Sequence, residues 1–401
     1  MRYDLMSFQS ISFRLQLPVI TIFLSMAWIA SRTVVRAAAA TSASSTTAAS
    51  TTAACSSAAT YIAPLDPDRC KLIGSASKNG VAVKLTALEP MGAKVEGLDL
   101  KGARPSDEVM NALEAEMANR GFLVFKNQHN VSPEESIEAT KWWGGREIHS
   151  THGVHPATPG TGSTRRHIFR LSNDRNKGIL GVGPQWHNDG AFEEAPFSHV
   201  TYHMLQIPDK GGGTHFVHQG AAYDVLDDET REYWSRLTSV NSNSGVVHPV
   251  VHEHYLSRRK TVYLHMGMTG AVIEKLKDEE GFRLLEEDEM KDLFTKYNAL
   301  LNDGFEKGYG ISYEYEDGDI IFIDNYAIAH RASPEAHLPV SKVGLRVMHR
   351  VTAKAPFDGF KPQFGLPQYI NIYDENPFGG NGVWIGGGIG FRFHPSLHYQ
   401  N

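Results

Sequence analysis

The chain has 401 residues, of which 41% are hydrophobic and 21% are charged, and its formal net charge is -6. This is ordinary globular composition, and a slightly acidic balance without a Lys/Arg block argues against a nucleic-acid binder that depends on phosphate neutralisation. The only cysteines are Cys55 and Cys70, so cysteine-ligated zinc and disulfide scaffolds are excluded beyond residue 70, where a metal must be bound by histidines and carboxylates.

The first 75 residues differ in composition from the rest. Residues 1–36 contain the apolar run LQLPVITIFLSMAWIA, which is short for a membrane span of about 20 residues and is typical of a signal peptide. Residues 37–75 begin with a stretch rich in Ala, Ser and Thr that is typical of a transit peptide or a linker. We expect a two-part leader that directs the protein to a plastid. A secretory signal, an uncleaved membrane anchor and a mitochondrial presequence are the alternatives.

The pattern of a compact domain begins near Gly80. The alternating stretch VAVKLTAL predicts a strand. A helix is predicted from Ser106 to Gly121, followed by the buried strand FLVF. Ser132 and Glu135 then form a capping box around Pro133, which predicts a second helix.

Strands dominate the remainder of the domain. Runs rich in β-branched and aromatic residues predict strands over residues 200–205, 261–266, 319–324 and 345–352. One amphipathic helix is predicted over residues 290–301, before Gly304. This arrangement predicts a mainly β domain with flanking helices over residues 76–356, closer to a jelly roll than to βαβ units. Residues 357–401 form a Gly- and aromatic-rich extension, either an irregular lid or an ordered tail.

Spacing selects a metal site from the 19 histidines of the chain. His187 and Asp189 are two residues apart, so in an extended chain their side chains project to the same side. His330 follows the predicted strand 319–324 after a short turn. Two histidines and one carboxylate with open positions form the facial triad of non-haem Fe(II) oxygenases, and the same set also suits catalytic zinc.

The strand that follows His330 carries two arginines on one face. Because a strand has a period of two, Arg346, Met348 and Arg350 point to the same side. A buried guanidinium is costly unless it is paired, and it binds planar carboxylates in bidentate fashion. The hydroxyl of Thr214, after the glycines 211–213, could hold the same carboxylate. The alternative is that both arginines face solvent.

These motifs together resemble the taurine and aryloxyalkanoate dioxygenase family. The similarity extends over roughly residues 82–356, and five motifs carry it in order: HNDG at 187–190, GGGT at 211–214, HPVV at 248–251, DGDIIFIDNYAIAH ending at His330, and LRVMHR ending at Arg350. The resemblance implies a double-stranded β-helix, a cupin-like jelly roll. It also implies an enzyme that uses Fe(II), 2-oxoglutarate and O2 to oxidise a C–H bond, with release of succinate and CO2.

The resemblance also assigns roles to individual residues. They are the metal ligands His187, Asp189 and His330, the 2-oxoglutarate anchors Thr214 and Arg346, and the substrate contacts Arg350, Phe192 and His152. Arg350 implies a small anionic substrate such as a sulfonate, an amino acid or an aryloxy acid. The alternative is that Arg350 pairs with a carboxylate of the protein. The family often forms oligomers, so a homo-oligomer is also expected.

Several other functions use similar residues. Hydroxylation is favoured over chlorination because halogenating relatives replace the carboxylate at the position of Asp189 with a small residue. Desaturation and oxidative cyclisation would need the same site residues and stay open. A zinc hydrolase would give no role to Arg346 and Thr214. A catalytically inactive cupin-like binding module is the alternative of another class, and the intact ligand set argues against it.

Overall fold

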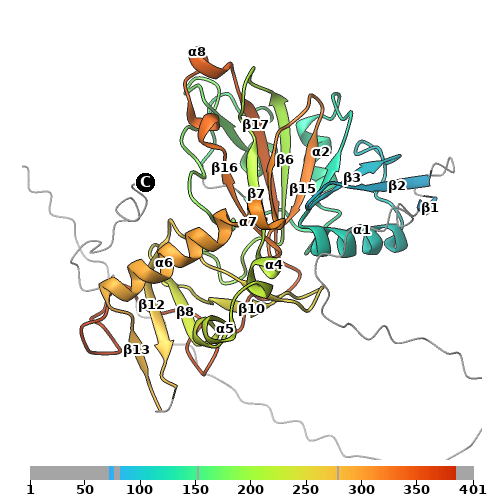
Figure 1. Cartoon of the computed structure of the whole chain (residues 1–401). Coiled ribbons are helices and arrows are strands. Elements are labelled where there is room, and N and C mark those ends of the chain that lie inside the picture. Colours follow the sequence, from blue (N-terminus) through green and yellow to red (C-terminus); the bar gives the residue numbers. More distant parts are fainter. Residues whose placement is uncertain (1–71, 76–81, 151–152, 278–279, 385–401) are drawn as a thin grey trace, which may run out of the picture. The chain divides into compact units, whose positions relative to one another are not determined.

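The computed structural model describes residues 72–75, 82–150, 153–277 and 280–384, which are mainly β structure with several helices (Figure 1). The predicted leader segment 1–36, most of segment 37–75 and the end of the extension after residue 384 lie outside the described residues. The plastid leader therefore stays a prediction. Within the described ranges, no helix is long and apolar enough to cross a membrane.

The strands are distributed along the described chain. They are β1 (Leu72–Ser75), β2 (Ala82–Ala87), β3 (Ala93–Glu96), β4 (Phe122–Phe125), β5 (Phe169–Ser172), β6 (His199–Gln206), β7 (Thr214–His218), β8 (Leu237–Asn241), β9 (Val247–Pro249), β10 (Val251–Glu253), β11 (Lys260–Val262), β12 (Thr269–Lys275), β13 (Phe282–Leu284), β14 (Gly310–Tyr313), β15 (Ile320–Asp324), β16 (Ile328–Ala332) and β17 (Val347–Ala353).

The helices lie mainly between groups of strands. They are α1 (Asp107–Arg120), α2 (Pro133–Thr140), α3 (Ser163–His167), α4 (Gln219–Asp224), α5 (Asp228–Ser235), α6 (Glu287–Asn302), α7 (Gly304–Lys307), the 3-10 helix η2 (Pro334–His337) and α8 (Val340–Val343).

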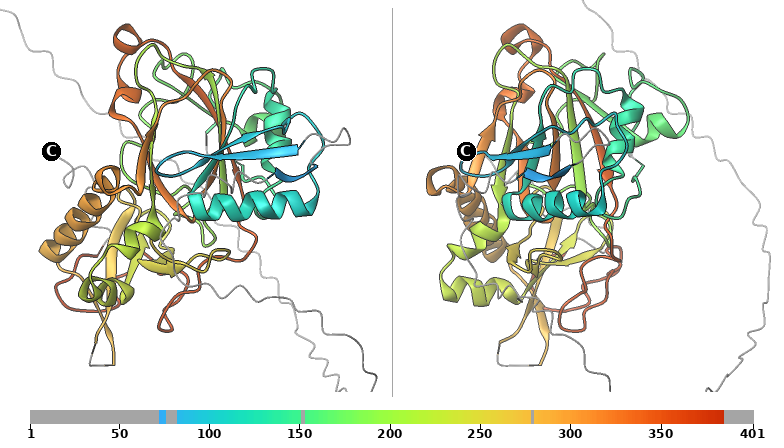
Figure 2. Two further views of the ribbon diagram at one scale, coloured as in Figure 1. Left: turned by 45° about the vertical axis from the view of Figure 1, so that its right-hand side comes forward. Right: turned by 90° about the vertical axis from the view of Figure 1, so that its right-hand side faces the viewer.

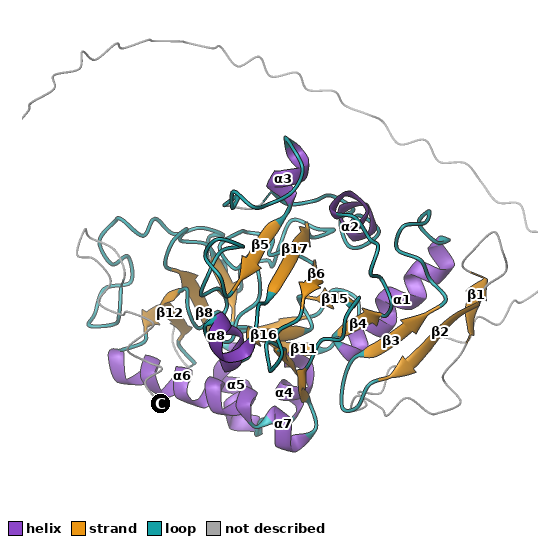
Figure 3. Ribbon diagram, turned by 90° about the horizontal axis from the view of Figure 1, so that it is seen from above, coloured by secondary structure: helices purple, strands orange, loops and turns teal. Residues whose placement is uncertain are grey.

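An eight-stranded sheet, here called the major sheet, has the strand order β1-β2-β3-β4-β15-β6-β17-β5, and Figure 3 shows this order from above. A three-stranded minor sheet has the order β14-β7-β16. Residues of β4, β6, β15 and β17 share one buried cluster with Phe216 and Ile328 of the minor sheet. The two sheets therefore pack against each other across this cluster.

The side chains of β15 are buried on both faces of the strand, as its central place in the major sheet requires. Ile321 and Ile323 belong to the cluster shared with the minor sheet, whereas Ile320 and Phe322 belong to a second cluster that includes α1. Both faces of β15 are buried, so a continuous apolar run is favoured there over a polar alternation. Figure 2 shows α1 alongside β2 and β3.

The predicted helices around the N-terminal part of the domain are confirmed. Ser106 caps α1 by accepting from the backbone N–H of Val109, and Gly121 ends the helix at φ 90°. In α2, Ser132 and Glu135 form the predicted capping box and Pro133 occupies the first turn. Such reciprocal caps satisfy backbone donors that the helix itself leaves without partners.

The predicted strand 261–266 is only partly correct. β11 ends at Val262, and the chain then runs beside the segment before His187: Met266 donates its backbone N–H to Trp186 over 3.3 Å. Residues 265–269 form a tight turn, because the carbonyl of His265 accepts from the N–H groups of Met268 and Thr269. The residue composition favoured a strand here, but these contacts favour a turn.

The C-terminal extension is an ordered part of the fold as far as residue 384. It crosses the four-stranded side sheet, which has the order β13-β12-β8-β9. Ile370 donates its N–H to Gly245 over 2.9 Å, and Val247 donates to Gln368 over 3.1 Å. Four of its side chains join the apolar cluster of the side sheet: Leu366, Ile370, Ile372 and Trp384. The extension therefore covers one face of this sheet.

We predict that Ile370→Ala lowers the free energy of unfolding by about 2–5 kcal/mol, because it removes apolar volume from a closed cluster. Ile370 is 8% exposed, whereas Tyr373 in the same segment is 75% exposed. Tyr373→Ala should therefore change stability by no more than about 0.5 kcal/mol. Urea denaturation of both variants measures this difference, and equal effects would show that the extension does not stabilise the side sheet.

Candidate metal centre

A backbone bridge brings His187 and His330 together from distant parts of the sequence. His187 donates its N–H to the carbonyl of His330 over 3.1 Å, and His330 donates back over 3.0 Å. Residues paired in this way in an antiparallel ladder direct their side chains to the same face. The centroids of the two imidazole rings lie 4.3 Å apart. The register of β16 thus sets the distance between the two imidazoles.

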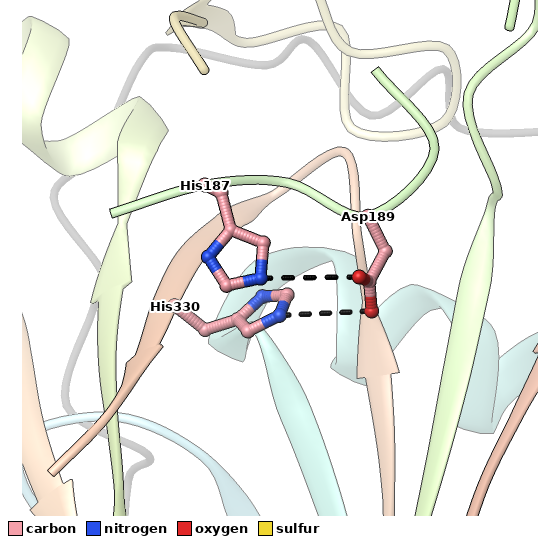
Figure 4. Close-up of side chains that lie close together, drawn as sticks. All are labelled: His187, Asp189 and His330. Carbon is pink, nitrogen blue, oxygen red and sulfur yellow. Dashed lines mark ion pairs between the residues drawn. The ribbon is translucent and has the colours of Figure 1, made fainter. Parts of the chain in front are cut away.

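Asp189 completes the group, as Figure 4 shows. Its Oδ1 lies 3.9 Å from Nε2 of His187, and its Oδ2 lies 3.7 Å from Nε2 of His330. These separations are too long for hydrogen bonds, and the three candidate ligand atoms all lie within 4.8 Å of one another. It is the one group of three or more His, Cys, Asp or Glu side chains with this geometry in the described ranges.

The buried atoms of this group lack partners within the protein. Oδ2 of Asp189 and both ring nitrogens of His330 are buried without a hydrogen bond to any described residue. Leaving such groups without partners is costly, which points to a ligand between them.

The protonation states also fit a divalent cation. Burial lowers the pKa of His330 to about 3, so its imidazole is neutral and retains a lone pair for a metal. Burial alone would raise the pKa of Asp189, but Arg350 and the neighbouring imidazoles lower it below its usual value. One carboxylate and two neutral imidazoles form the donor set that suits Fe(II).

A buried amide network fixes the backbone on either side of Asp189. The side chain of Asn325 accepts from the N–H of Asp189 over 2.9 Å and donates to its carbonyl over 2.8 Å. The side chain of Asn188 donates to the carbonyls of Asn325 and Ile328 over 2.7 and 2.8 Å. The sequence analysis did not assign these two roles. The only signal for them in the sequence is the presence of Asn188 in the motif HND and of Asn325 in the motif FIDNY.

Gly190 allows the chain to turn directly after Asp189. Its φ is +79°, and a Cβ atom there would lie 2.9 Å from the backbone nitrogen of Phe197. Only glycine accommodates both the positive φ and this close approach.

A cavity lies beside the two histidines, between the major and minor sheets. Its wall includes five of the residues selected from the sequence: His187, His330, Thr214, Arg346 and Arg350. Met348 also lines it, so the predicted common face of Arg346, Met348 and Arg350 is confirmed. Asp189 is not among the lining residues, and Tyr202 of β6 is a lining residue that sequence reasoning did not select.

Arg346 lies in this cavity without a carboxylate partner. It is 6% exposed, its Nε donates to the carbonyl of Gly212 over 2.8 Å, and no ion pair joins it to an acidic side chain anywhere in the described chain. Burial lowers its pKa below the usual range. The hydroxyl of Thr214, in the same cavity wall, lies 2.7 Å from that of Tyr315. A buried guanidinium in this position favours an anionic ligand.

Arg350 has a protein partner in the structure. Its Nη1 donates to Oδ1 of Asp189 over 2.5 Å, and its guanidinium lies over the ring of Phe169, 4.6 Å from the centroid. The alternative of a protein carboxylate is therefore realised here, and the carboxylate belongs to the metal centre. A contact between Arg350 and the substrate stays a prediction.

The other two predicted substrate contacts are not placed in this cavity. Phe192 lines a separate hollow together with Phe197, His149 and Phe357 of the extension. His152 lies outside the described residues. Their roles stay predictions.

The sequence pattern of the family described as "Taurine catabolism dioxygenase TauD, TfdA family" matches residues 84–352 of the chain. The chain is 23% identical over 314 residues to an alpha-ketoglutarate-dependent sulfonate dioxygenase of Saccharomyces cerevisiae, with 71% of each chain covered. It is 25% identical over 268 residues to an (S)-phenoxypropionate/alpha-ketoglutarate-dioxygenase of Delftia acidovorans, and the matched region covers 61% of this chain and 87% of the relative.

Solved structures agree at the level of the fold. A taurine dioxygenase from Burkholderia xenovorans superposes with a TM-score of 0.53 at 18% identity, covering 68% of this chain and 91% of the other.

We predict that Asp189→Ala lowers the affinity for Fe(II) by at least about 100-fold, because it removes the only anionic member of the donor set. Anaerobic calorimetric titration with Fe(II) measures this. Asp228→Asn is the matched control, since that carboxylate is 98% exposed and lies away from the cavity. If Asp189→Ala bound Fe(II) like the control while remaining folded, the ligand assignment would be wrong.

Proposed function

Because the chain belongs to the taurine catabolism dioxygenase (TauD, TfdA) family, it is a 2-oxoglutarate-dependent dioxygenase that uses Fe(II), 2-oxoglutarate and O2, and we propose that it hydroxylates a small anionic substrate. The observation that carries the proposal is the cavity in which two arginines and the histidines of the metal centre meet. A zinc hydrolase and an inactive binding module are not supported, because the family membership assigns dioxygenase chemistry.

In this proposal the major and minor sheets form the two halves of a double-stranded β-helix, and the cluster they share is its interior. The metal centre lies where an extended segment pairs with β16, beside that interior. Residues that must meet at the reaction site therefore come from strands on opposite sides of one barrel.

The cofactors supply the oxidising power. When bound, Fe(II), 2-oxoglutarate and O2 would oxidise a substrate C–H bond with release of succinate and CO2. The protein places the reactants: His187, Asp189 and His330 would hold Fe(II), and Arg346 and Thr214 would hold the distal carboxylate of 2-oxoglutarate. Arg346 suits this role since it is a buried cation without an acidic partner in the described chain.

The substrate class follows from Arg350. Its guanidinium faces the cavity and has one strong hydrogen bond, to Asp189, while its Nε is buried without a described partner. A sulfonate or carboxylate of the substrate could occupy the remaining donors of this guanidinium. The relatives named for sulfonates and phenoxypropionate support an anionic substrate. Hydroxylation or a related oxidation is favoured over chlorination because Asp189 keeps its carboxylate, and desaturation and oxidative cyclisation stay open as alternatives.

We predict that Arg346→Ala weakens 2-oxoglutarate binding by about 30-fold or more, because the distal carboxylate loses a buried charged partner. Arg346→Lys should give an intermediate affinity, since it retains the charge but not the planar fork. Anaerobic titration of the Fe(II)-loaded protein, followed by the weak visible charge-transfer band, measures both. Unchanged affinity in a folded Arg346→Ala variant would contradict the assignment.

Arg350→Ala should weaken binding of the substrate and leave binding of 2-oxoglutarate nearly unchanged. We predict a 2-oxoglutarate affinity within about threefold of the unaltered chain, and an apparent KM for the anionic substrate raised about tenfold or more. Succinate release measured against a panel of sulfonates, amino acids and aryloxy acids tests this. An active substrate whose KM does not respond to the loss of Arg350 would show that the anion binds elsewhere.

A further inference from the structure

His265 lies at the metal centre but has no role in the function proposed so far. The centroid of its ring is 5.4 Å from that of His187. It is also close enough to interact electrostatically with Asp189 and His330, the other two members of the centre. The sequence analysis did not select His265.

The position of His265 is fixed by its own turn. Its carbonyl accepts from the N–H of Met268 over 3.2 Å, the N–H of Thr269 over 3.0 Å and the hydroxyl of Thr269 over 2.9 Å. The N–H of Met266 donates to Trp186, the residue before His187. The backbone of His265 is therefore tied to the same segment that presents the metal ligand.

The ring is oriented by a hydrogen bond that also determines where its proton lies. The N–H of Gly267 donates to Nδ1 of His265 over 3.1 Å. Because Nδ1 is an acceptor, a neutral ring carries its hydrogen on Nε2.

The Nε2–H of His265 is an available donor. No hydrogen bond to it occurs in the part of the chain that the structure describes, and the residue as a whole is partly exposed. A fixed donor without an acceptor beside a metal centre is suited to a bound ligand.

2-Oxoglutarate has two carboxylates, and the site described above provides for only one of them. Arg346 and Thr214 would hold the distal carboxylate. The α-carboxylate, which lies next to the keto group that reacts, has no donor assigned to it. Resting on the proposed function, we infer that Nε2–H of His265 donates a hydrogen bond to the α-carboxylate of 2-oxoglutarate at the metal, and that His265 is a further cofactor-binding residue.

Two substitutions separate this role from a structural one. His265→Asn places an amide oxygen where Nδ1 is, so it can still accept from Gly267, but it has no group that reaches the position of Nε2. His265→Gln extends an amide N–H towards that position. Both are tested in the Fe(II)-loaded full chain, with 2-oxoglutarate itself as the probe, by anaerobic titration followed through the visible charge-transfer band. Fe(II) affinity is measured separately by calorimetry.

We expect His265→Asn to raise the Kd for 2-oxoglutarate about 10- to 100-fold, because a hydrogen bond to a charged group is lost. Fe(II) affinity should stay within about twofold, and His265→Gln should recover most of the 2-oxoglutarate affinity. The inference is overturned if His265→Asn leaves this Kd unchanged. It is also overturned if both variants lose Fe(II) affinity or thermal stability equally, since that would indicate a structural role. Absence of 2-oxoglutarate binding by the unaltered chain would instead contradict the proposed function.

Discussion

The antiparallel backbone bridge between His187 and His330 is the constraint on which the rest of the site depends. It joins an extended segment to β16 through two reciprocal hydrogen bonds and sets both imidazoles on one face. A shift of one residue in this register would turn His330 to the opposite face of β16. Asn325 adds a second restraint, because its amide holds both backbone groups of Asp189. The positions of the three ligand residues are thus fixed by hydrogen bonds to their backbone groups and not by hydrogen bonds between their side chains.

The charges in the cavity are arranged around one buried carboxylate. Arg350 pairs with Asp189 through Oδ1, which leaves Oδ2 directed towards His330 without a described partner. Asp189 can therefore give one oxygen to Arg350 and the other to a metal, so the ion pair and metal binding do not exclude each other. Arg346 is the complementary case, a buried cation without an acidic partner in the described residues. Its desolvation is costly until an anion arrives, which makes it selective for an anionic cofactor.

The sequence predicted the parts of the fold and site that depend on local pattern. The caps of α1 and α2, the common face of Arg346, Met348 and Arg350, and the meeting of His187 with Asp189 all follow from short spacings. What could not be predicted depends on contacts between distant segments. β11 ends at Val262 because the following residues bond to Trp186 and to their own turn, and the partner of Arg350 is 161 residues away. Composition alone carries no information on such pairings.

The packing of the C-terminal extension connects the fold to the site. Phe357 lines the hollow that contains Phe192, and Phe360 belongs to a buried aromatic cluster with Ala191, the residue after Gly190 of the HNDG motif. The imidazole of His248 contacts the carbonyl of Ala191 over 3.0 Å, so the same turn is supported from the side sheet as well. The family match ends at residue 352, before these aromatic residues. The turn after the metal ligand Asp189 is thus packed in part by residues that lie beyond the matched region.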